Sequence, residues 1–574
     1  MSWGAKHIFI VALLGLCVNV RGETVFCRSM DRVASMDPAE ASSLYASRAV
    51  RMVYETLYEY DYAARPYKLI PGLAEALPEV QSNGLVYVFR IHPEARFQPD
   101  PCFGADAAGQ PRGRSVTAED VVFSLKRLAD RKVGSPGAWL VEDAVAGMRA
   151  FSDASAGTGP TDYAMPVAGL RALDARTVCI ELTRPMNVFA YYLTISYSSI
   201  VPQEAVTRYG KDLGEHAVGS GPYRLADWQR NHQMTYTRDP LWRGWTAGPA
   251  AVDPASGEVP FDRVVYRLID DVSTQWLCFL AGELDFLGEV TRDNWDVVID
   301  GSGGLSASLQ ERGFSLYAMP TLEVAYIGFN MDDPVVGKNR ALRQALNCAI
   351  DGEAWERFYN HRVIRCDGPV PPGTAGRLAT PFPYASNLDK AKALLREAGY
   401  PEGADPKTGK RLELTLDLGR TSQDMRESTE LLVSFLARVG IALKPQFHNW
   451  PTFLKRVSGR QSQMFRLSWS GDYPDAENFM QLFYSKNVSP GPNRANYANP
   501  EFDRLYEAAS VATDGAERAR AWGLAQERVR EDCPWLFLYF QKSYSLCNAK
   551  VLKYQPSDFP YGTEKYLRTG RKQK

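Results

Sequence analysis

The stretch that says most about this fold reads Met464-Phe-Arg-Leu-Ser468, continued by Trp469-Ser-Gly-Asp-Tyr-Pro-Asp-Ala-Glu-Asn-Phe479. Apolar and polar residues alternate over 464–468, as is typical of a β-strand, and the Gly and Pro that follow indicate a turn. A strand that leads into a polar turn with a carboxylate is well placed to hold one charged end of an extended ligand.

Residues of equal parity on a strand face the same side, so Arg466, Ser468, Ser470 and Asp472 are predicted to share one face. That face carries a cation at one end and an anion at the other, roughly 20 Å apart along the backbone. The small side chains between them leave room for a ligand backbone to pair as an added strand. The pattern suits a zwitterionic peptide of a few residues.

Each of these residues also has a purely structural interpretation, which the sequence leaves open. Asp472 could make an Asx turn before Tyr473-Pro474. Trp469 has the opposite strand parity from Asp472 and could belong to the core. Arg466 could pair with a local carboxylate.

Length and charge narrow the class of protein. A chain of 574 residues is too long for one core and predicts about three or four domains. The 66 Lys and Arg balance the 67 Asp and Glu, without a basic stripe or patch, so a nucleic-acid partner is not expected.

The N-terminus has the features of a secretory signal over residues 1–22. Lys6 and His7 precede the apolar run 8–18, which is long enough for a signal and too short to span a bilayer. An N-terminal anchor or a buried helix is the alternative. Leu16 stands before Cys17 where a lipoprotein needs a small residue, so we expect a freely soluble exported protein rather than a lipoprotein.

Metal, cofactor and enzyme motifs are missing from the sequence. The eight cysteines after the signal form no CxxC pair, and we interpret most of them as buried free thiols, with one or two disulfides left open. The six histidines are scattered without HExxH, and neither a P-loop nor a G-x-S-x-G motif occurs. Asp472 and Asp475 could imitate a carboxylate dyad, but Pro474 between them favours a turn. No cofactor and no enzymatic activity are expected.

Alternating strand and helix patterns, for example strand 412–418, helix 427–439 and strand 441–447, predict α/β lobes. Several landmarks then resemble the oligopeptide/dipeptide-binding family, the large solute-binding proteins of peptide-type ABC importers (extracellular solute-binding family 5). Beside the opening motif, the matching segments are Met36-Asp-Pro38, Thr117-Ala-Glu-Asp-Val121, Gly219-Ser-Gly-Pro-Tyr223, Arg343-Gln-Ala-Leu-Asn-Cys-Ala-Ile-Asp351, Asp389-Lys-Ala-Lys-Ala-Leu-Leu-Arg-Glu-Ala-Gly-Tyr400 and Tyr497-Ala-Asn-Pro-Glu-Phe-Asp503.

The resemblance implies an α/β, two-lobe periplasmic-binding-protein fold with a hinge and an additional domain inserted in lobe I. The chain would cross between the lobes near Pro320–Val324 and near Pro534–Leu538. The implied segments are 1–22 for the signal peptide, 23–49, 197–318 and 536–574 for lobe I, 50–196 for the accessory domain and 319–535 for lobe II.

The resemblance also implies roles in the cleft. In such relatives the Asp at the position of Asp472 takes the ligand's α-ammonium, and the Trp at the position of Trp469 lines the cleft. Arg466 resembles an Arg used toward the ligand's carboxylate, which favours oligopeptides over dipeptides. Ser470 departs from the pattern, since some relatives have a disulfide-bonded Cys there.

The expected function is therefore that of a periplasmic receptor, a monomer that captures peptides by hinge closure. It would deliver them to an ABC permease whose partner ATPase supplies the energy. The alternatives are the same fold with a non-peptide solute, such as an oligosaccharide, a metal chelate or haem, and a secreted hydrolase.

Overall fold

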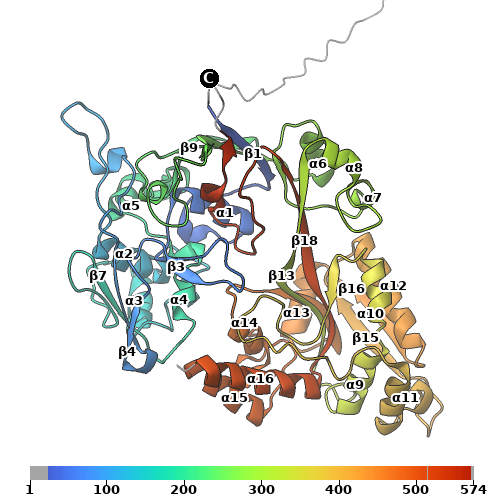
Figure 1. Ribbon diagram of the computed structural model, residues 1–574. Coiled ribbons are helices and arrows are strands. Elements are labelled where there is room, and N and C mark those ends of the chain that lie inside the picture. The colour runs from blue at the N-terminus through green and yellow to red at the C-terminus, as the bar shows by residue number, and fades with distance from the viewer. Residues whose placement is uncertain (1–22, 513–514, 571–574) are drawn as a thin grey trace, which may run out of the picture.

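The computed structural model describes residues 23–512 and 515–570, so the predicted signal peptide lies outside the described residues. Two lobes of mixed α/β structure are joined by two long strands, and a third unit packs beside the first lobe (Figure 1). The predicted two-lobe α/β fold is confirmed. In the part of the chain that is described, no helix is long and apolar enough to cross a membrane.

One sheet runs through both lobes in the strand order β16-β15-β17-β13-β18-β12-β1-β11-β9-β8, and β14 pairs with β18. Its strands are β1 Val25–Met30, β8 Tyr223–Gln229, β9 Gln233–Arg238, β11 Arg263–Leu268, β12 Phe286–Leu287, β13 Phe314–Phe329, β14 Val363–Arg365, β15 Glu413–Leu418, β16 Ala442–Phe447, β17 Met464–Ser470 and β18 Trp535–Asn548. Because β13 and β18 belong to both lobes, a bend in these two strands would move one lobe against the other.

The core of lobe I forms between helix α1 (Leu44–Val53) and strands β1, β9 and β11. Ser43 begins the helix, since its Oγ accepts a hydrogen bond from the backbone N of Ala46 at 3.0 Å. Strand β1 pairs in parallel with β11. A second cluster of apolar side chains packs under three short helices near β12: α6 Val272–Leu280, α7 Trp295–Val298 and α8 Ala307–Glu311.

The accessory domain is an antiparallel sheet of order β4-β5-β7-β6 that packs against helices α2 and α3. The predicted capping box at the start of α2 is confirmed: the Thr117 backbone N donates to Asp120 Oδ2 at 2.8 Å. The elements of this part are β2 Tyr58–Tyr60, β3 Leu69–Pro71, β4 Glu79–Gln81, β5 Val86–Arg90, α2 Ala118–Ala129, α3 Met148–Ser155, β6 Leu170–Ala172, β7 Thr177–Glu181 and α4 Phe189–Tyr192. Helix α5 Gln203–Tyr209 follows in the second segment predicted for lobe I.

Lobe II surrounds the other end of the sheet with helices. Asn387 caps α11 as predicted, accepting from the Lys390 backbone N at 2.9 Å, and Gly399 follows the helix with φ +86°. The helices are α9 Arg340–Ala349, α10 Gly352–Phe358, α11 Leu388–Glu397, α12 Gln423–Ala437, α13 Trp450–Ser458, α14 Ala476–Met480, α15 Pro500–Val511 and α16 Gly515–Asp532.

The two crossing strands are irregular at one level. Pro320 pairs with Lys542 and Val324 with Phe540, so three residues of β13 face one residue of β18. The bulge is held by Asp558, whose Oδ1 accepts from the backbone N of Leu322 at 2.8 Å. On β13 this level coincides with the crossing predicted near Pro320–Val324, and on β18 it lies a few residues beyond the predicted 534–538.

One predicted segment boundary needs correction. The division at 49/50 falls inside α1, and Ala46 and Ala49 before it pack in the same core as Val50 and Val53 after it. The helix cannot be split, because its buried face is continuous. The first segment of lobe I therefore extends to the end of α1.

The cysteines behave as the sequence predicts for most of them. Cys179, Cys348, Cys533 and Cys547 are buried, and none of the seven cysteines from Cys102 to Cys547 forms a disulfide. Desolvation raises the pKa of the Cys348 thiol to about 11. Buried thiols of this kind pack as small apolar side chains.

Candidate ligand-binding cleft

Strand β17 runs two residues further than predicted, because Trp469 and Ser470 still pair with β13. Ser468 and Ser470 are exposed and Trp469 between them is half-buried against the lobe II core, as the alternation predicts. On its other side, β17 pairs with β15 only as far as Arg466. Residues 467–470 therefore have an edge with no neighbouring strand among the described residues, where an extended ligand could pair.

The turn after β17 is organised by Asn478, a fully buried residue of α14. Its Oδ1 accepts from Trp469 Nε1 at 2.9 Å and from the Asp472 backbone N at 3.2 Å. Its Nδ2 donates to Asp472 Oδ2 at 3.3 Å. The Asn478 amide thus holds both the Trp469 indole and the Asp472 carboxylate in place. The stretch 464–479 includes Asn478, but its sequence pattern did not predict this role.

Asp472 carries an uncompensated charge. Among the described residues no Lys, Arg or His forms an ion pair with it, and its carboxylate accepts from no backbone amide, so the Asx turn is not formed. Desolvation in the wall of the cleft raises the pKa of Asp472, and the hydrogen bond from Asn478 lowers it only in part. A cation from a ligand would stabilise this carboxylate.

Asp475, three residues on, has the opposite surroundings. It is buried and forms a bidentate pair with Arg518 at 2.7 and 2.8 Å, and it caps α14 through the Glu477 backbone N. Between the two carboxylates, Tyr473 inserts into the accessory core and stacks on Tyr191 at 5.8 Å. The two aspartates are therefore not a catalytic dyad, and the turn is anchored on both sides.

Two cavities meet at this turn. The smaller, about 270 Å³, is lined by Asp472 together with side chains of lobe I and the accessory domain, including Tyr60 and Tyr197. The larger, about 570 Å³, lies between the lobe I wall and the crossing strands. Ser470, Gly471 and Tyr561 line both, so the cavities form one cleft between the lobes.

Arg466 lies apart from these cavities. Its guanidinium is buried behind the strand, where Nη1 donates to Ser428 Oγ at 2.8 Å and Nη2 to the Tyr359 hydroxyl at 3.1 Å. It also lies 5.7 Å from the ring centre of Trp355. It lines neither cavity and has no carboxylate partner among the described residues. The alternation of the strand predicted that Arg466 shares a face with Asp472. In the structure, α10 and α12 pack over the part of this face that carries Arg466.

The sequence model described as "Bacterial extracellular solute-binding proteins, family 5 Middle" matches residues 68–491. The chain belongs to this family. The match covers well over half of the chain, so the family assignment predicted from the motifs is confirmed. Members of the family are binding proteins.

Individual relatives cover almost the whole of this family 5 protein. Heme-binding protein A of Haemophilus influenzae is 26% identical over 534 residues, which cover 91% of this chain and 87% of that protein. The periplasmic murein peptide-binding protein MppA of Escherichia coli strain K12 is 25% identical over 554 residues, covering 94% and 92%. The unliganded open form of MppA superposes with a TM-score of 0.75 at 23% identity, covering 95% and 97% of the two chains, which supports the fold.

Proposed function

We propose that this family 5 protein captures short peptides in the cleft between its lobes and delivers them to a membrane ABC permease driven by a partner ATPase. The observation that carries the proposal is the carboxylate of Asp472, without an ion-pair partner among the described residues, in the wall of the smaller cavity beside Ser470 and Gly471, which line both cavities. A peptide α-ammonium would supply the missing cation, and charge-assisted hydrogen bonds are the strong ones.

The rest of the ligand would lie along β17. Ser468 and Ser470 are exposed and small, and the edge of 467–470 is open to a ligand backbone. Trp469 forms the adjacent wall, held by Asn478. The role predicted for Arg466 toward a ligand carboxylate stays a prediction, which the Arg466→Gln variant described below tests.

Capture would involve closure of the lobes about the bulge in β13 and β18 near Pro320–Val324 and Phe540–Lys542. Contacts from both lobes to one ligand favour the closed state, because only that state makes both sets at once. Contacts already made between the lobes include the ion pair of Arg292 of lobe I with Glu427 of α12 at 2.7 Å. Tyr473 of the turn after β17 also stacks on Tyr191 of the accessory domain.

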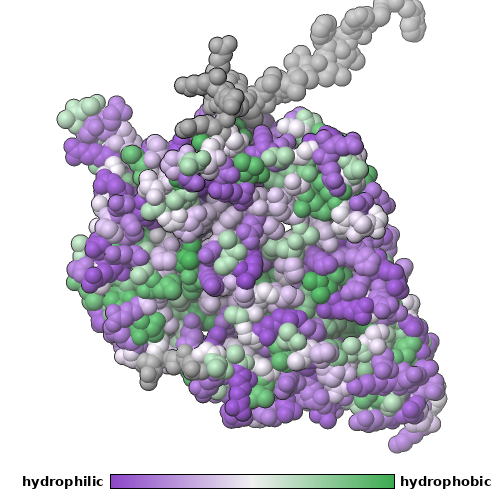
Figure 2. All heavy atoms as spheres, viewed as in Figure 1, coloured by the Kyte–Doolittle hydropathy of each residue, from purple (hydrophilic) through white to green (hydrophobic). Residues whose placement is uncertain are grey.

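The protein is proposed to act as a monomer in the periplasm, without a metal or a nucleic-acid partner. On the face seen in Figure 2, hydrophobic residues are scattered among hydrophilic ones across both lobes. Among the described residues, no group of three His, Cys, Asp or Glu could hold a metal ion. The near-zero net charge gives no electrostatic basis for binding nucleic acid.

A non-peptide solute is the second candidate. The smaller cavity has aromatic walls, including Tyr60, Tyr62 and Phe559, which could stack on a sugar ring. No histidine is among the described residues that line either cavity, so haem or metal-chelate ligation by imidazole finds no support there. The uncompensated Asp472 favours a cationic ligand end over a neutral sugar.

Native mass spectrometry of the purified protein tests the proposal. The expected result is a co-purified mass in the range of a short peptide, lost on unfolding, and weaker retention of the same peptides once they are N-acetylated. A co-purified sugar or porphyrin, or equal binding of acetylated peptides, would contradict the proposed ammonium site.

A further inference from the structure

The larger cavity has a second uncompensated charge, on the lobe I side. Arg48 of α1 lines it and is only 6% exposed. Its sole hydrogen bond among the described residues runs from Nε to the Pro560 carbonyl at 3.3 Å, and it forms no ion pair. Its neighbour one turn on, Arg51, differs: a nitrogen of Arg51 lies 3.8 Å from Glu59.

A second guanidinium adds to the positive potential of this wall. Arg28 of β1 also lines the larger cavity, lies 4.4 Å from the ring centre of Phe286 and pairs with Glu564 at 3.3 Å. Among the described residues, Glu564 forms an ion pair with Arg28 and not with Arg48. Burial and the charge of Arg28 lower the pKa of Arg48 to about 10, and the charge of Glu564 offsets this only in part.

The carboxylates that line the same cavity do not neutralise Arg48. Asp270 and Glu289 are exposed, and Asp31, Glu323 and Asp558 are half-buried. The Asp558 carboxylate accepts from the Leu322 backbone N and the Tyr67 hydroxyl. None of them lies within ion-pair distance of Arg48, and charges in contact with water are screened. The arginine therefore keeps an unused binding capacity toward a planar anion, which a guanidinium receives with two hydrogen bonds.

The two uncompensated charges belong to opposite walls of one cleft. Tyr561 lines both cavities and feels both charges: Arg48 lowers the pKa of its hydroxyl and Asp472 raises it. Asp472 comes from lobe II and Arg48 from the core helix of lobe I. A ligand that reaches from one to the other spans the gap between the lobes.

We propose that Arg48 receives a carboxylate of the peptide ligand, across the cleft from the ammonium site at Asp472. This inference rests on the proposed function. The ligand's two charges then hold two different lobes, so a zwitterion clamps them together. A peptide that lacks either charge is held by one wall only.

The experiment uses synthetic pools of tri-, tetra- and pentapeptides of random sequence without Asp or Glu. One pool has free termini, one a C-terminal amide and one an N-terminal acetyl group. A fourth pool has a C-terminal amide and one Glu in each peptide. Immobilised full-length mature protein is exposed to each pool, and retained peptides are quantified by mass spectrometry.

The wild type is expected to retain free-terminus peptides at least tenfold better than the amidated pool. Arg48→Gln should lose this preference while it still rejects acetylated peptides, and Arg48→Lys should keep part of it. Selective recovery of amidated Glu peptides by the wild type and not by Arg48→Gln would identify a side-chain carboxylate as the anion that Arg48 receives.

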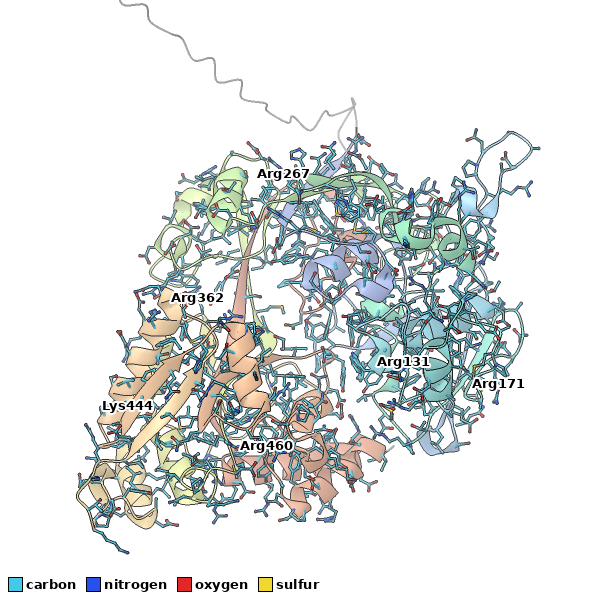
Figure 3. All side chains as sticks on the ribbon, turned by 180° about the vertical axis from the view of Figure 1, so that it is seen from behind. Arg131, Arg171, Arg267, Arg362, Lys444 and Arg460 are labelled. Carbon is cyan, nitrogen blue, oxygen red and sulfur yellow. The ribbon has the colours of Figure 1, made fainter. Side chains whose placement is uncertain are left out.

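Two matched variants separate this inference from its rivals. Arg466→Gln removes the arginine predicted from the sequence and should keep the wild-type preference. Arg171→Gln removes an exposed arginine on the accessory sheet, far from β13 and β18 (Figure 3), and should behave as the wild type. Thermal unfolding of each variant checks that the fold is intact.

The inference is overturned if folded Arg48→Gln keeps the preference for free carboxylates, if Arg466→Gln loses it instead, or if the wild type retains amides equally well. In these outcomes rejection of acetylated peptides would persist, and the proposed function would stand. Retention of no pool, or equal retention of acetylated peptides, overturns the proposed function and this inference with it.

Discussion

The turn after β17 has two sides, which differ in whether the buried carboxylate has a cationic partner. On the side of α14, Asp475 is matched by Arg518 with two short hydrogen bonds. On the cleft side, the Asp472 carboxylate has one hydrogen-bond partner among the described residues, the amide of Asn478. Helix α1 shows the same division, with Arg51 near Glu59 and Arg48 without a carboxylate partner.

A buried charge with an oppositely charged partner is thus distinguished from a buried charge that is available to a ligand. A buried ion that is paired and hydrogen-bonded contributes to the fold, and an uncompensated one is costly unless a ligand completes it. Asp472 and Arg48 line the cavities, whereas the compensated Asp475 faces the packed interior. Arg466, which also lacks a carboxylate partner among the described residues, lies outside the cavities and donates to two hydroxyls. Substitutions on each side of the turn test this distinction.

The largest effect is expected for Asp475→Asn. Removal of one partner leaves Arg518 buried without its anion, which should lower the free energy of unfolding by about 3 to 5 kcal/mol. Urea unfolding followed by circular dichroism measures this. Asp472→Asn is the matched variant, three residues away, and should unfold at or above the wild-type urea concentration. Equal losses in both variants would remove the distinction.

Asp472→Asn should instead weaken binding. Loss of the anion that receives the ligand's ammonium should cost about 2 to 5 kcal/mol, or tens to thousands of times in Kd. Titration calorimetry with a peptide recovered from the wild type measures it. Asp153→Asn, on the exposed surface of the accessory domain, is the control and should bind as the wild type. Unchanged affinity in Asp472→Asn would refute the anchor.

Asp558 is intermediate between Asp475 and Asp472. It has no cationic partner among the described residues, but the neutral Leu322 amide and Tyr67 hydroxyl donate hydrogen bonds to it at the bulge. Desolvation raises its pKa to about 6. The folded state therefore binds more protons than the unfolded chain between pH 4 and 6, and the free energy of unfolding falls as pH rises through this range.

Asp558→Asn should remove about 1 to 2 kcal/mol of this fall, a figure reduced for solvent screening of a half-buried group. Urea unfolding at several pH values from 4 to 7 measures it, with Asp153→Asn as the control. A variant whose slope matches that of the wild type would show that the carboxyl titrates normally.

The smallest effect is expected for the exposed pair between the lobes. Arg292 contacts Asp424 and Glu427 of α12, and Arg362 of lobe II lies over Trp295 of lobe I at 5.6 Å (Figure 3). Arg292→Gln should change ligand affinity by less than about 1 kcal/mol, and only at low salt. Calorimetry at two salt concentrations tests this, and a tenfold change that survives high salt would contradict it.

Much of the site follows from local pattern. The alternation of β17 placed Ser468 and Ser470 on an exposed face, and the Gly and Pro after it predicted the turn that carries Asp472. These features depend on strand geometry and turn chemistry, which act over a few residues. The family was predicted from the resemblance of ordered motifs along the chain to a known family, and the two lobes were implied by that resemblance.

Arg466 shows where local pattern fails. Parity places it on one side of the strand, but whether that side is open depends on α12 and on the end of α10. Their residues Ser428 and Tyr359, which are 38 and 107 positions away in the sequence, cover the guanidinium. Asn478 and Arg48 were missed because the sequence around an amide or an arginine on a helix does not indicate which distant groups it contacts, or that it has no ion-pair partner.

The sequence by itself determined the strand, the turn and the charged residue at its tip, because propensity and periodicity are short-range properties. Only the tertiary structure decided which charges are compensated, because compensation depends on segments brought together from distant parts of the chain. Asp475 pairs with Arg518 of another helix, whereas Asp472 and Arg48 line one cleft from two different lobes.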